Sequence, residues 1–205
     1  MRYGIMPKLM WQVFAPSFRR ALPLIVQQAS NIVMKKAHAE YKHILDGIPE
    51  FDKGDRFLVN ILSASMLVAV LKQLGVKPNL EQVTAYYHKA MNENAVMKLF
   101  LCKSNNYNEK AQSKLALQAI ESQRRNNPYS WKFRYEAGPN INSYTATFST
   151  CGICHLFEAQ GLSEYIPAMC TYDYDMAAGS GTIFTRQYTL AGGGPCCDCH
   201  YQKQG

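Results

Sequence analysis

The stretch FLVNILSASMLVAVL, residues 57–71, is apolar on nearly every side of a helix. Asn60, Ser63 and Ser65 interrupt it, and it is shorter than the roughly 18 residues that a membrane span requires. A helix that is apolar all round lies in the interior of a globular protein. We therefore predict a helix over residues 55–74, ended by Gly75, at the centre of the fold.

Three further helices are predicted around this central one, at residues 17–45, 80–102 and about 108–123. Each begins at a residue whose short polar side chain favours the N-cap position: Ser17, Asn79, and either Asn106 or Asn108. Pro23 lies within the first two turns of the first helix, so the alternative start for that helix is just after Pro23.

The pattern changes after the helix-breaking residues 126–128, Asn-Asn-Pro. Residues 129–135 and 143–150 alternate aromatic or β-branched side chains with polar ones, and a Gly-Pro-Asn turn separates them, which predicts a β-hairpin. The remaining predicted elements are two helices, at 151–160 and 163–178, and two strands, at 182–190 and 198–202.

These elements predict an α+β fold, in which an N-terminal helical bundle is followed by a small antiparallel sheet with covering helices. The length of 205 residues suits one domain over residues 1–205. Within it we distinguish a helical scaffold, residues 1–127, from an α+β part, residues 128–205, that is expected to carry the functional site.

The formal net charge of +7 is distributed unevenly. Residues 1–127 hold 18 Lys and Arg against 9 Asp and Glu, whereas residues 128–205 hold 4 against 6. The basic residues occur in pairs at most and match no nucleic-acid-binding motif, so we expect no nucleic acid partner. The first residues lack the apolar core and cleavage site of a signal peptide, so we expect a cytoplasmic protein with no membrane partner.

Six of the seven cysteines lie in the last 55 residues. In a reducing compartment, an odd number of cysteines favours free thiols or metal ligands over disulfides. Thiol, carboxylate and imidazole groups serve as nucleophiles, acid–base catalysts and metal ligands. The C-terminal part is therefore where we expect the chemistry.

The segment CGICH, residues 151–155, follows a predicted strand and opens a predicted helix. A helix N-terminus favours the thiolate and lowers the pKa of a cysteine placed there. The same pair of cysteines is half of a metal-ligand set, and Cys154 is equally interpretable as a small buried side chain. Further along, Cys170 and Asp173 are three residues apart and share one face of a predicted helix.

Arg186 is the only arginine after Arg134, and it lies on a predicted strand between two glycine-rich turns. A guanidinium group binds a carboxylate with two hydrogen bonds. Its partner is either a substrate carboxylate or one of three aspartates: Asp173, Asp175 and Asp198.

The tail CCDCH, residues 196–200, holds three cysteines, an aspartate and a histidine. Side chains alternate faces along an extended segment. Cys197 and Cys199 are therefore predicted to point one way, and Cys196, Asp198 and His200 the other. A nucleophile and its base are expected to come from different segments rather than from neighbours in this tail.

The C-terminal third resembles the L-2-amino-thiazoline-4-carboxylic acid hydrolase family. Five features carry the resemblance, in chain order. They are a cysteine after a strand (Cys151), a segment from glycine to proline (residues 161–167), a Cys-x-x-Asp (Cys170 and Asp173), an Arg-x-x-Thr followed by glycine (Arg186, Thr189 and Gly192) and a terminal Cys-Asp (Cys197 and Asp198). The chain departs from the family pattern after Asp198, because the aromatic residue is displaced to Tyr201.

The resemblance implies a hydrolase that acts on a non-peptide carbon–nitrogen bond in a small anionic cyclic compound. The named reaction adds water to 2-amino-thiazoline-4-carboxylate and gives N-carbamoyl-cysteine, although another cyclic amidine, imine or amide is an open alternative. A thiolate fits the attack on the amidine-like carbon, with Cys197 as first choice and Cys170 as second. Asp198 or Asp173 is expected to protonate the ring nitrogen and then activate water. We expect Arg186, Thr189 and Cys151 to bind the substrate, without a cofactor.

Several alternatives stay open at this stage. Carboxylates or a bound metal could activate water directly, without a covalent step. The chain could instead be a metal or iron–sulfur protein in which five cysteines bind zinc or iron: Cys151, Cys154, Cys170, Cys197 and Cys199. A domain that binds small anions without turnover is a third class. A homo-oligomer is a further option, assembled through the aromatic hairpin at Trp131, Phe133 and Tyr135.

Overall fold

The computed structural model describes residues 1–27 and 30–205. Its centre is α3, Leu58–Leu71, in which eleven successive residues from Ile61 to Leu71 are buried. Two helices from the N-terminal part of the chain, α1 (Ile5–Ala21) and α2 (Ser30–Asp46), pack against α3, and α7 (Gly152–Ala159) from the C-terminal part packs against it as well. The prediction of a buried central helix is confirmed, and no helix in the described ranges is long and apolar enough to cross a lipid bilayer.

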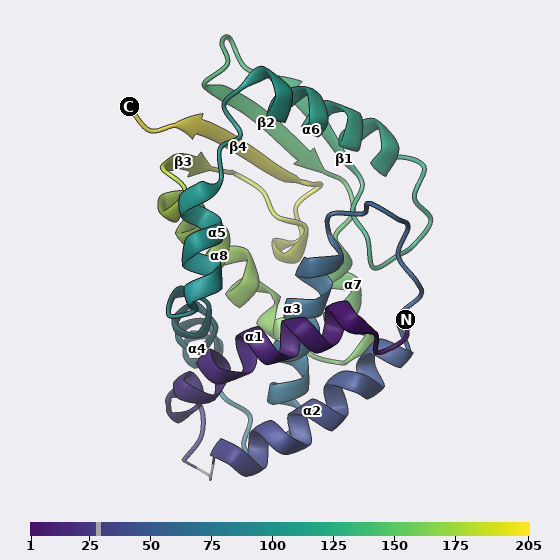
Figure 1. Cartoon of the computed structure of the whole chain (residues 1–205), viewed down its shortest axis with the longest axis vertical. Helices are drawn as coiled ribbons and strands as arrows, with labels where there is room; N and C mark the ends of the chain where they lie inside the picture. The colour runs from purple at the N-terminus through teal and green to yellow at the C-terminus, as the bar shows by residue number, and fades with distance from the viewer. Residues whose placement is uncertain (28–29) are drawn as a thin grey trace.

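The fold is α+β, as predicted, with most of the helices below a small sheet (Figure 1). The helical elements before the sheet are α1 Ile5–Ala21, η1 Leu22–Leu24, α2 Ser30–Asp46, α3, α4 Leu80–Asn92, α5 Ala95–Lys103 and α6 Glu109–Ser122. The later helical elements are α7 Gly152–Ala159, η2 Ser163–Tyr165, α8 Ile166–Gly179 and η3 Leu190–Gly192.

The predicted helix at 17–45 is wrong over its first part, and its residues 28 and 29 lie outside the described residues. Ser17 lies inside α1 rather than at a helix start, and its hydroxyl donates to the Phe14 carbonyl at 2.9 Å. Pro23 lies in η1, the short turn that follows α1, so the alternative start after Pro23 was closer to the observed α2. Pro16 lies within α1, where its missing N–H is tolerated because neighbouring helices hold the segment.

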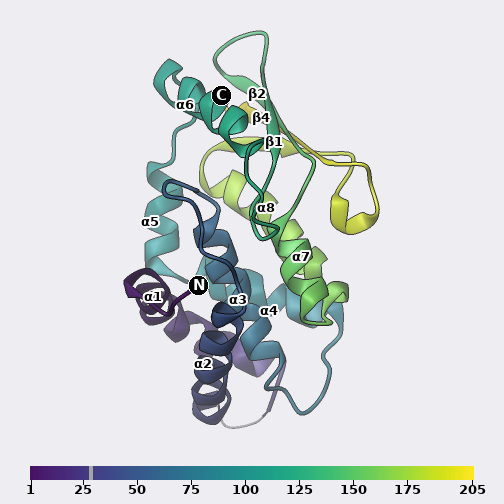
Figure 2. The same cartoon turned by 90° about the vertical axis from the view of Figure 1, so that its right-hand side faces the viewer.

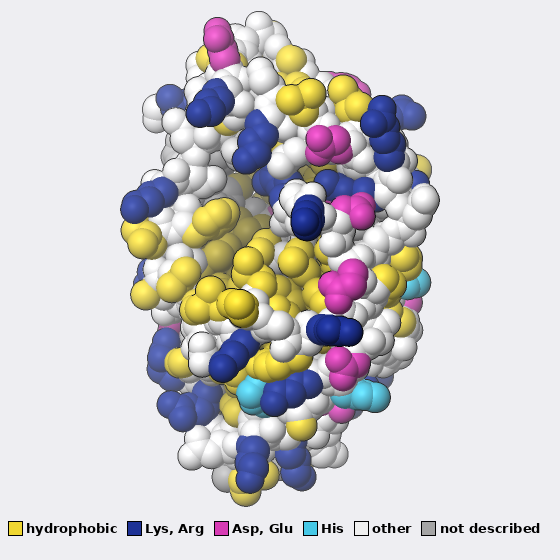
Figure 3. Space-filling model, turned by 45° about the vertical axis from the view of Figure 1, so that its right-hand side comes forward, with side chains coloured by type: hydrophobic (Ala, Val, Ile, Leu, Met, Phe, Trp, Pro, Cys, Tyr) yellow, Lys and Arg dark blue, Asp and Glu magenta, His cyan; other side chains and the backbone are white. Residues whose placement is uncertain are grey.

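The predicted helix at 80–102 is two helices, α4 and α5. Asn79 caps α4 through a reciprocal pair of hydrogen bonds with Gln82, as expected for an N-cap asparagine. Asn94 separates the two helices, because its side chain caps α5 by accepting from the Met97 N–H at 3.0 Å. The same side chain donates to the Val13 carbonyl of α1 at 2.9 Å. Both α1 and α5 carry exposed apolar side chains, and Figure 3 shows apolar side chains gathered on one face of the molecule.

The sheet contains four strands, β1 Phe133–Ala137, β2 Ser143–Phe148, β3 Thr182–Thr185 and β4 Cys197–Lys203. All neighbours are antiparallel and the order is β1-β2-β4-β3, so the predicted hairpin is confirmed and β4 lies in the interior of the sheet. The predicted strand at 182–190 is too long, because β3 ends at Thr185 and a loop follows. Figure 2 shows α8 between the sheet and the helical half, where it packs against both β3 and α4.

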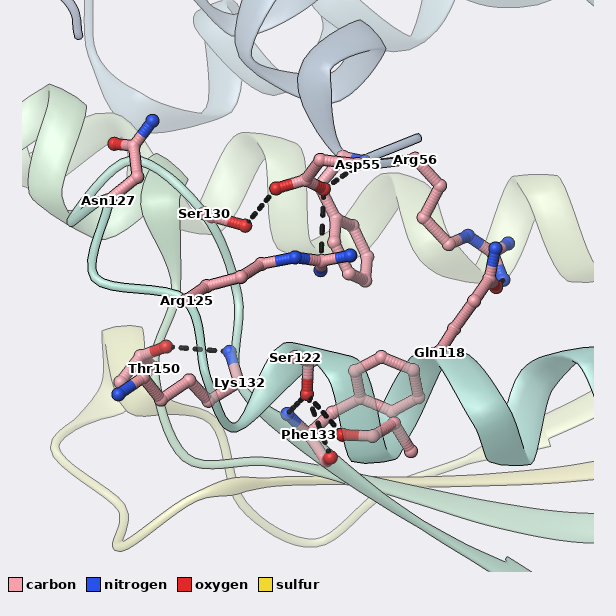
Figure 4. Close-up of polar contacts among 12 residues, drawn as sticks. Asp55, Arg56, Gln118, Ser122, Arg125, Asn127, Ser130, Lys132, Phe133 and Thr150 are labelled. Carbon is pink, nitrogen blue, oxygen red and sulfur yellow. Dashed lines mark hydrogen bonds and ion pairs between the residues drawn. The ribbon is translucent and has the colours of Figure 1, made fainter. Parts of the chain in front are cut away.

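A buried polar cluster ties the start of α3 to the segment between α6 and β1 (Figure 4). The Asp55 carboxylate accepts from the Phe57 N–H at 3.0 Å and from the Ser130 hydroxyl, and it lies 3.4 Å from the Arg125 guanidinium. Only 1% of the Asp55 side chain and 7% of the Arg125 side chain are exposed. A charge this deeply buried is tolerated only with such partners.

We expect Asp55→Ala to lower the free energy of unfolding by about 3–5 kcal/mol, because it leaves the Arg125 charge buried without its partner. The measurement is urea unfolding followed by circular dichroism. Arg56→Ala is the matched control, since that neighbouring side chain is exposed and its hydrogen bond to Gln118 lies at the surface, and it should change stability by less than about 0.5 kcal/mol. Equal effects of the two substitutions would contradict this role of Asp55.

Candidate functional site

The alternation of β4 places its cysteines on the inner face of the sheet. Cys197, Cys199 and Tyr201 pack among buried apolar residues, whereas His200 faces outward and is exposed. Asp198 shares the outer face and lies 3.4 Å from the His200 imidazole. The predicted separation of Cys197 and Cys199 from Asp198 and His200 is therefore confirmed.

Arg186 directly follows β3 and reaches across to α8. Its guanidinium donates to the Asp173 carboxylate at 2.7 Å and to the Cys170 carbonyl at 2.5 Å. It also lies over the rings of Tyr174 and Phe184, at 5.3 and 5.4 Å from their centroids. Only 7% of the Arg186 side chain is exposed, so it is a buried cation. Of the three aspartates that the sequence allowed as its partner, the structure places Asp173 there.

Asp173 lies at the edge of the same cluster, with 37% of its side chain exposed. Burial of the carboxyl group raises the pKa of Asp173, and Arg186 opposes that rise. Burial and the nearby Asp173 together raise the pKa of the Cys170 thiol to about 12. Cys170 is therefore a neutral thiol near pH 7, whereas Asp173 is an acid that holds its proton more firmly than an exposed aspartate.

Cys151 occupies the N-cap of α7, directly after the strand β2 and its short connection. A hydrogen bond from the Cys154 thiol lowers the pKa of Cys151, burial opposes this, and the backbone N–H groups of Cys154 and Ile153 lower it further. The same interaction raises the pKa of Cys154, so the proton of the pair resides on Cys154. Cys151 is thus a thiol whose surroundings stabilise the thiolate.

The glycine after Cys151 allows this helix end to press against another segment. A Cβ atom on Gly152 would lie 2.0 Å from the Tyr129 carbonyl oxygen, a distance that no side chain can adopt. The backbone of Tyr129 therefore fixes where α7 begins, and with it the position of Cys151.

Cys197 receives a hydrogen bond from the Leu190 N–H at 3.2 Å, which ties β4 to the loop after β3. Burial raises the pKa of Cys197, and this N–H opposes the rise. Thr189 braces the same loop, since its hydroxyl accepts from the Gly192 N–H at 3.0 Å. Gly193 completes the turn with a φ of 78°, a conformation that favours glycine.

The thiols and the carboxylate share one electrostatic environment. The Asp173 charge raises the pKa values of Cys151 and Cys197, and the Cys151 charge raises that of Cys170. These groups come from α7, α8 and β4, elements far apart in the chain. Within the described part of the chain, the structure therefore brings together five of the predicted site residues: Cys151, Cys170, Asp173, Arg186 and Cys197.

Asp198 lies on the outer face of the sheet, away from its sequence neighbour Cys197. Its carboxylate accepts from the Tyr188 N–H at 2.6 Å and from the Gln187 N–H at 3.1 Å. Partial burial favours the neutral acid, but these N–H donors outweigh it and lower the pKa of Asp198. Asp198 is thus an ionised carboxylate that holds the loop beyond Arg186 from the outer face of the sheet.

The remaining cysteines offer less for chemistry. Cys199 is buried against Ala177 and Phe184, and burial raises the pKa of its thiol to about 12. All seven cysteines are free. Among residues 1–27 and 30–205, no three His, Cys, Asp or Glu side chains are arranged so that they could hold a metal ion.

Two surface hollows lie away from this cluster. One is lined by residues of α4, from Leu80 to His88, and the other by residues near the end of α5 and the C-terminus, including Tyr107 and Lys203. The candidate site is instead a half-buried cluster at the meeting of α7, α8 and the loop after β3. Its solvent-reachable members include Cys151, Cys197 and Asp173.

Comparisons with known proteins identify one family. A family model described as L-2-amino-thiazoline-4-carboxylic acid hydrolase matches residues 59–201, which include all of α3 but its first residue and every residue of the cluster. No curated protein and no solved structure matches the chain.

The lowered pKa of Cys151 predicts selective alkylation. Iodoacetamide should modify Cys151 with a half-maximal rate at a pH below about 8.5, the ordinary thiol value, because its thiolate persists to lower pH. Peptide mass spectrometry over a pH series measures this, and the exposed Cys102 is the internal reference for the reagent. Cys154→Ala removes the donor and should shift the Cys151 midpoint upward, whereas an unchanged midpoint would contradict the assigned hydrogen bond.

Removing the Arg186 cation should destabilise the C-terminal part. We expect Arg186→Gln to lower the free energy of unfolding by about 2 kcal/mol, less than for a fully buried pair because Asp173 is partly exposed. Arg134→Gln on the exposed face of β1 is the control and should be nearly neutral. Equal urea midpoints for Arg186→Gln and the unsubstituted protein would show that the cluster does not depend on this ion pair.

Proposed function

Because the chain belongs to the L-2-amino-thiazoline-4-carboxylic acid hydrolase family, we propose that it hydrolyses a small anionic cyclic amidine, with Cys151 as the nucleophile. The observation that carries the proposal is the N-cap thiol of α7, whose pKa is lowered, in one environment with Asp173 and Arg186. This assignment moves the nucleophile from Cys197 and Cys170, because burial raises the pKa values of both.

In the first step, the Cys151 thiolate adds to the carbon that carries the ring nitrogen, the ring sulfur and the amino group, while the ring nitrogen holds a proton. The bond from this carbon to the ring sulfur then breaks, and the departing sulfur takes a proton from Asp173. The product is an isothiourea linked through sulfur to Cys151. One bond has formed and one has broken, with no change of oxidation state.

In the second step, water adds to the same carbon and gives a proton to the Asp173 carboxylate. The bond to Cys151 breaks, the thiolate returns to the helix N-terminus, and the proton first carried by the ring amidine is released to solvent. The product is N-carbamoyl-cysteine, the substrate plus one water. An acid with a raised pKa suits the proton donor in the first half and the base in the second.

Arg186 supports these steps in two ways. It orients Asp173 through the bond at 2.7 Å, and a guanidinium group has further N–H donors that suit the carboxylate of the substrate. Thr189 and Asp198 act on the loop between β3 and β4, which they hold through the Gly192 and Tyr188 N–H groups. We assign them positioning roles.

The free state of all seven cysteines suits a reducing, cytoplasmic setting. Nothing in the proposed reaction calls for a cofactor, a nucleic acid or a membrane. Zinc or iron held by Cys151, Cys154, Cys170, Cys197 and Cys199 is the competing proposal, in which the thiols would be ligands and metal content would follow their substitution.

The test is a mass-spectrometric screen of cyclic amidines, imines and amides, with 2-amino-thiazoline-4-carboxylate first, for products heavier by one water. Cys151→Ser should lower the rate by at least about a hundredfold. Asp173→Asn should lower it by a similar factor. Asp198→Asn is the control for a positioning role and should keep measurable turnover.

The outcomes separate the alternatives. Full activity of Cys151→Ser combined with loss in Cys197→Ser would return the nucleophile to Cys197. Retention of activity by both variants would favour direct attack of water. One equivalent of zinc or iron in the purified protein, lost in Cys154→Ser, would overturn the covalent proposal in favour of a metal site.

A further inference from the structure

The first turn of α7 carries a second cysteine that the proposed reaction leaves without a step of its own. Cys151 is the N-cap and Cys154 is the third residue of the helix. The side chains at these two positions meet at the open end of a helix, as they do in a capping box. The Cys154 thiol donates a hydrogen bond to the Cys151 sulfur, and both cysteines are free and partly exposed. The two thiols therefore face one another across a single helical turn.

Contacts outside the helix hold the backbone of this turn in place. The Cys151 carbonyl accepts from the His155 N–H at 3.2 Å, which closes the turn. Gly152 is packed against the Tyr129 carbonyl, and the rings of Tyr129 and His155 are in edge contact, with 4.6 Å between their centroids. The two cysteines are thus carried on one fixed segment, and a bond between their sulfur atoms requires only side-chain rotation.

We propose that Cys151 and Cys154 form a reversible disulfide when the protein meets a small-molecule disulfide such as glutathione disulfide. Disulfide oxidoreductases use the same Cys-x-x-Cys spacing. In a reducing compartment such a disulfide forms transiently. The inference goes beyond the proposed reaction and does not depend on it. Because the disulfide consumes the Cys151 thiol, it would also stop the proposed hydrolysis, and that consequence alone rests on the proposed function.

In the first step, the Cys151 thiolate attacks one sulfur of glutathione disulfide. A bond forms between Cys151 and that glutathione, and the sulfur–sulfur bond of the reagent breaks. The other glutathione leaves as a thiolate and takes a proton from solvent. The surroundings that lower the pKa of Cys151 favour this step, because the thiolate is the attacking form.

In the second step, Cys154 becomes the attacking thiol. The hydrogen bond to Cys151 is the main cause that raises the pKa of Cys154 in the resting protein, and burial and the Cys151 charge add to it. The Cys151 sulfur is neutral in the mixed disulfide, so the effects of the hydrogen bond and the charge disappear and the pKa of Cys154 falls. Cys154 then releases its proton, attacks the Cys151 sulfur and expels the bound glutathione, which takes up a proton. Counted from the two thiols, the protein loses two electrons and two protons, and glutathione disulfide gains them.

Two other thiols lie near Cys151, but they belong to different elements. Cys170 is on α8, which lies against α7 (Figure 2), and the Cys197 sulfur accepts from the Leu190 N–H at 3.2 Å. A bond from Cys151 to either thiol would have to draw two elements together, whereas a bond to Cys154 stays within one turn. The structure therefore favours Cys154 as the partner.

Redox titration with peptide mass spectrometry tests the proposal. The folded protein is equilibrated at a series of glutathione to glutathione disulfide ratios, quenched with acid, alkylated with N-ethylmaleimide and cleaved with chymotrypsin. Cleavage after Phe148 and Leu156 gives the peptide STCGICHL, residues 149–156, which contains both cysteines and no other. This peptide should become lighter by two hydrogens and resist alkylation, and dithiothreitol should reverse both changes.

The exposed Cys102 is the internal reference, since no second cysteine lies in its helix. It should need at least about tenfold more glutathione disulfide to be half modified. Cys154→Ser keeps a hydrogen-bond donor beside Cys151 but cannot complete the second step, so it should retain glutathione on Cys151. Cys170→Ser is the matched control and should still form the disulfide.

Circular dichroism checks that each variant is folded. The proposal is overturned if the unsubstituted protein carries glutathione on Cys151 and forms no disulfide at any ratio. A disulfide from Cys151 to Cys170 or Cys197 would also overturn it, as would oxidation of residues 149–156 no more readily than Cys102. These readouts require no turnover, so their outcome is separate from that of the hydrolase assay.

Discussion

The complete burial of α3 is the constraint on which the rest of the structure depends. A helix with eleven successive buried residues must be covered on all sides, and the covering elements come from both ends of the chain. Helices α1 and α2 cover it from one end, and α7 covers it from the other. The contact of α7 with α3 fixes the position of Cys151 together with the backbone of Tyr129, because Leu156 and Phe157 anchor α7 in the core.

The site follows from how four segments meet above that core. Backbone N–H groups at the N-terminus of α7 stabilise the thiolate of Cys151. Arg186 is a buried cation that orients Asp173. Burial raises the pKa values of Cys170, Cys197 and Cys199. Cys151 is thereby favoured as a thiolate, whereas the neighbouring thiols stay protonated. This difference is what distinguishes Cys151 as the candidate nucleophile.

Local sequence signals were sufficient for much of the fold. The all-apolar helix, the asparagine caps at Asn79 and Asn108 and the alternating hairpin depend on residues near one another, and the structure confirms them. The errors arose where distant contacts decide. Asn94 divides α4 from α5 partly by bonding to α1, and the shortness of β3 allows Arg186 to leave the sheet and meet α8.

The same distinction applies to the site. Residue types and spacing identified the cluster members, and the strand alternation placed Cys197 and Cys199 together. The sequence could not rank the thiols, because the pKa of each depends on burial and on partners from other elements. One sequence signal did favour a thiolate at Cys151, because this cysteine follows a strand and opens a helix. The outward position of Asp198 was equally implied by alternation, but its bonds to the Tyr188 and Gln187 N–H groups required the fold.

The most direct measurement is rapid acid quenching of the protein during turnover of 2-amino-thiazoline-4-carboxylate, followed by peptide mass spectrometry. The account predicts that the peptide containing Cys151 gains the mass of the intact substrate, as an isothiourea, and that this adduct decays as product forms. An adduct confined to the peptide containing Cys197, or turnover with no adduct on any cysteine, would contradict the assignment of Cys151 as the nucleophile.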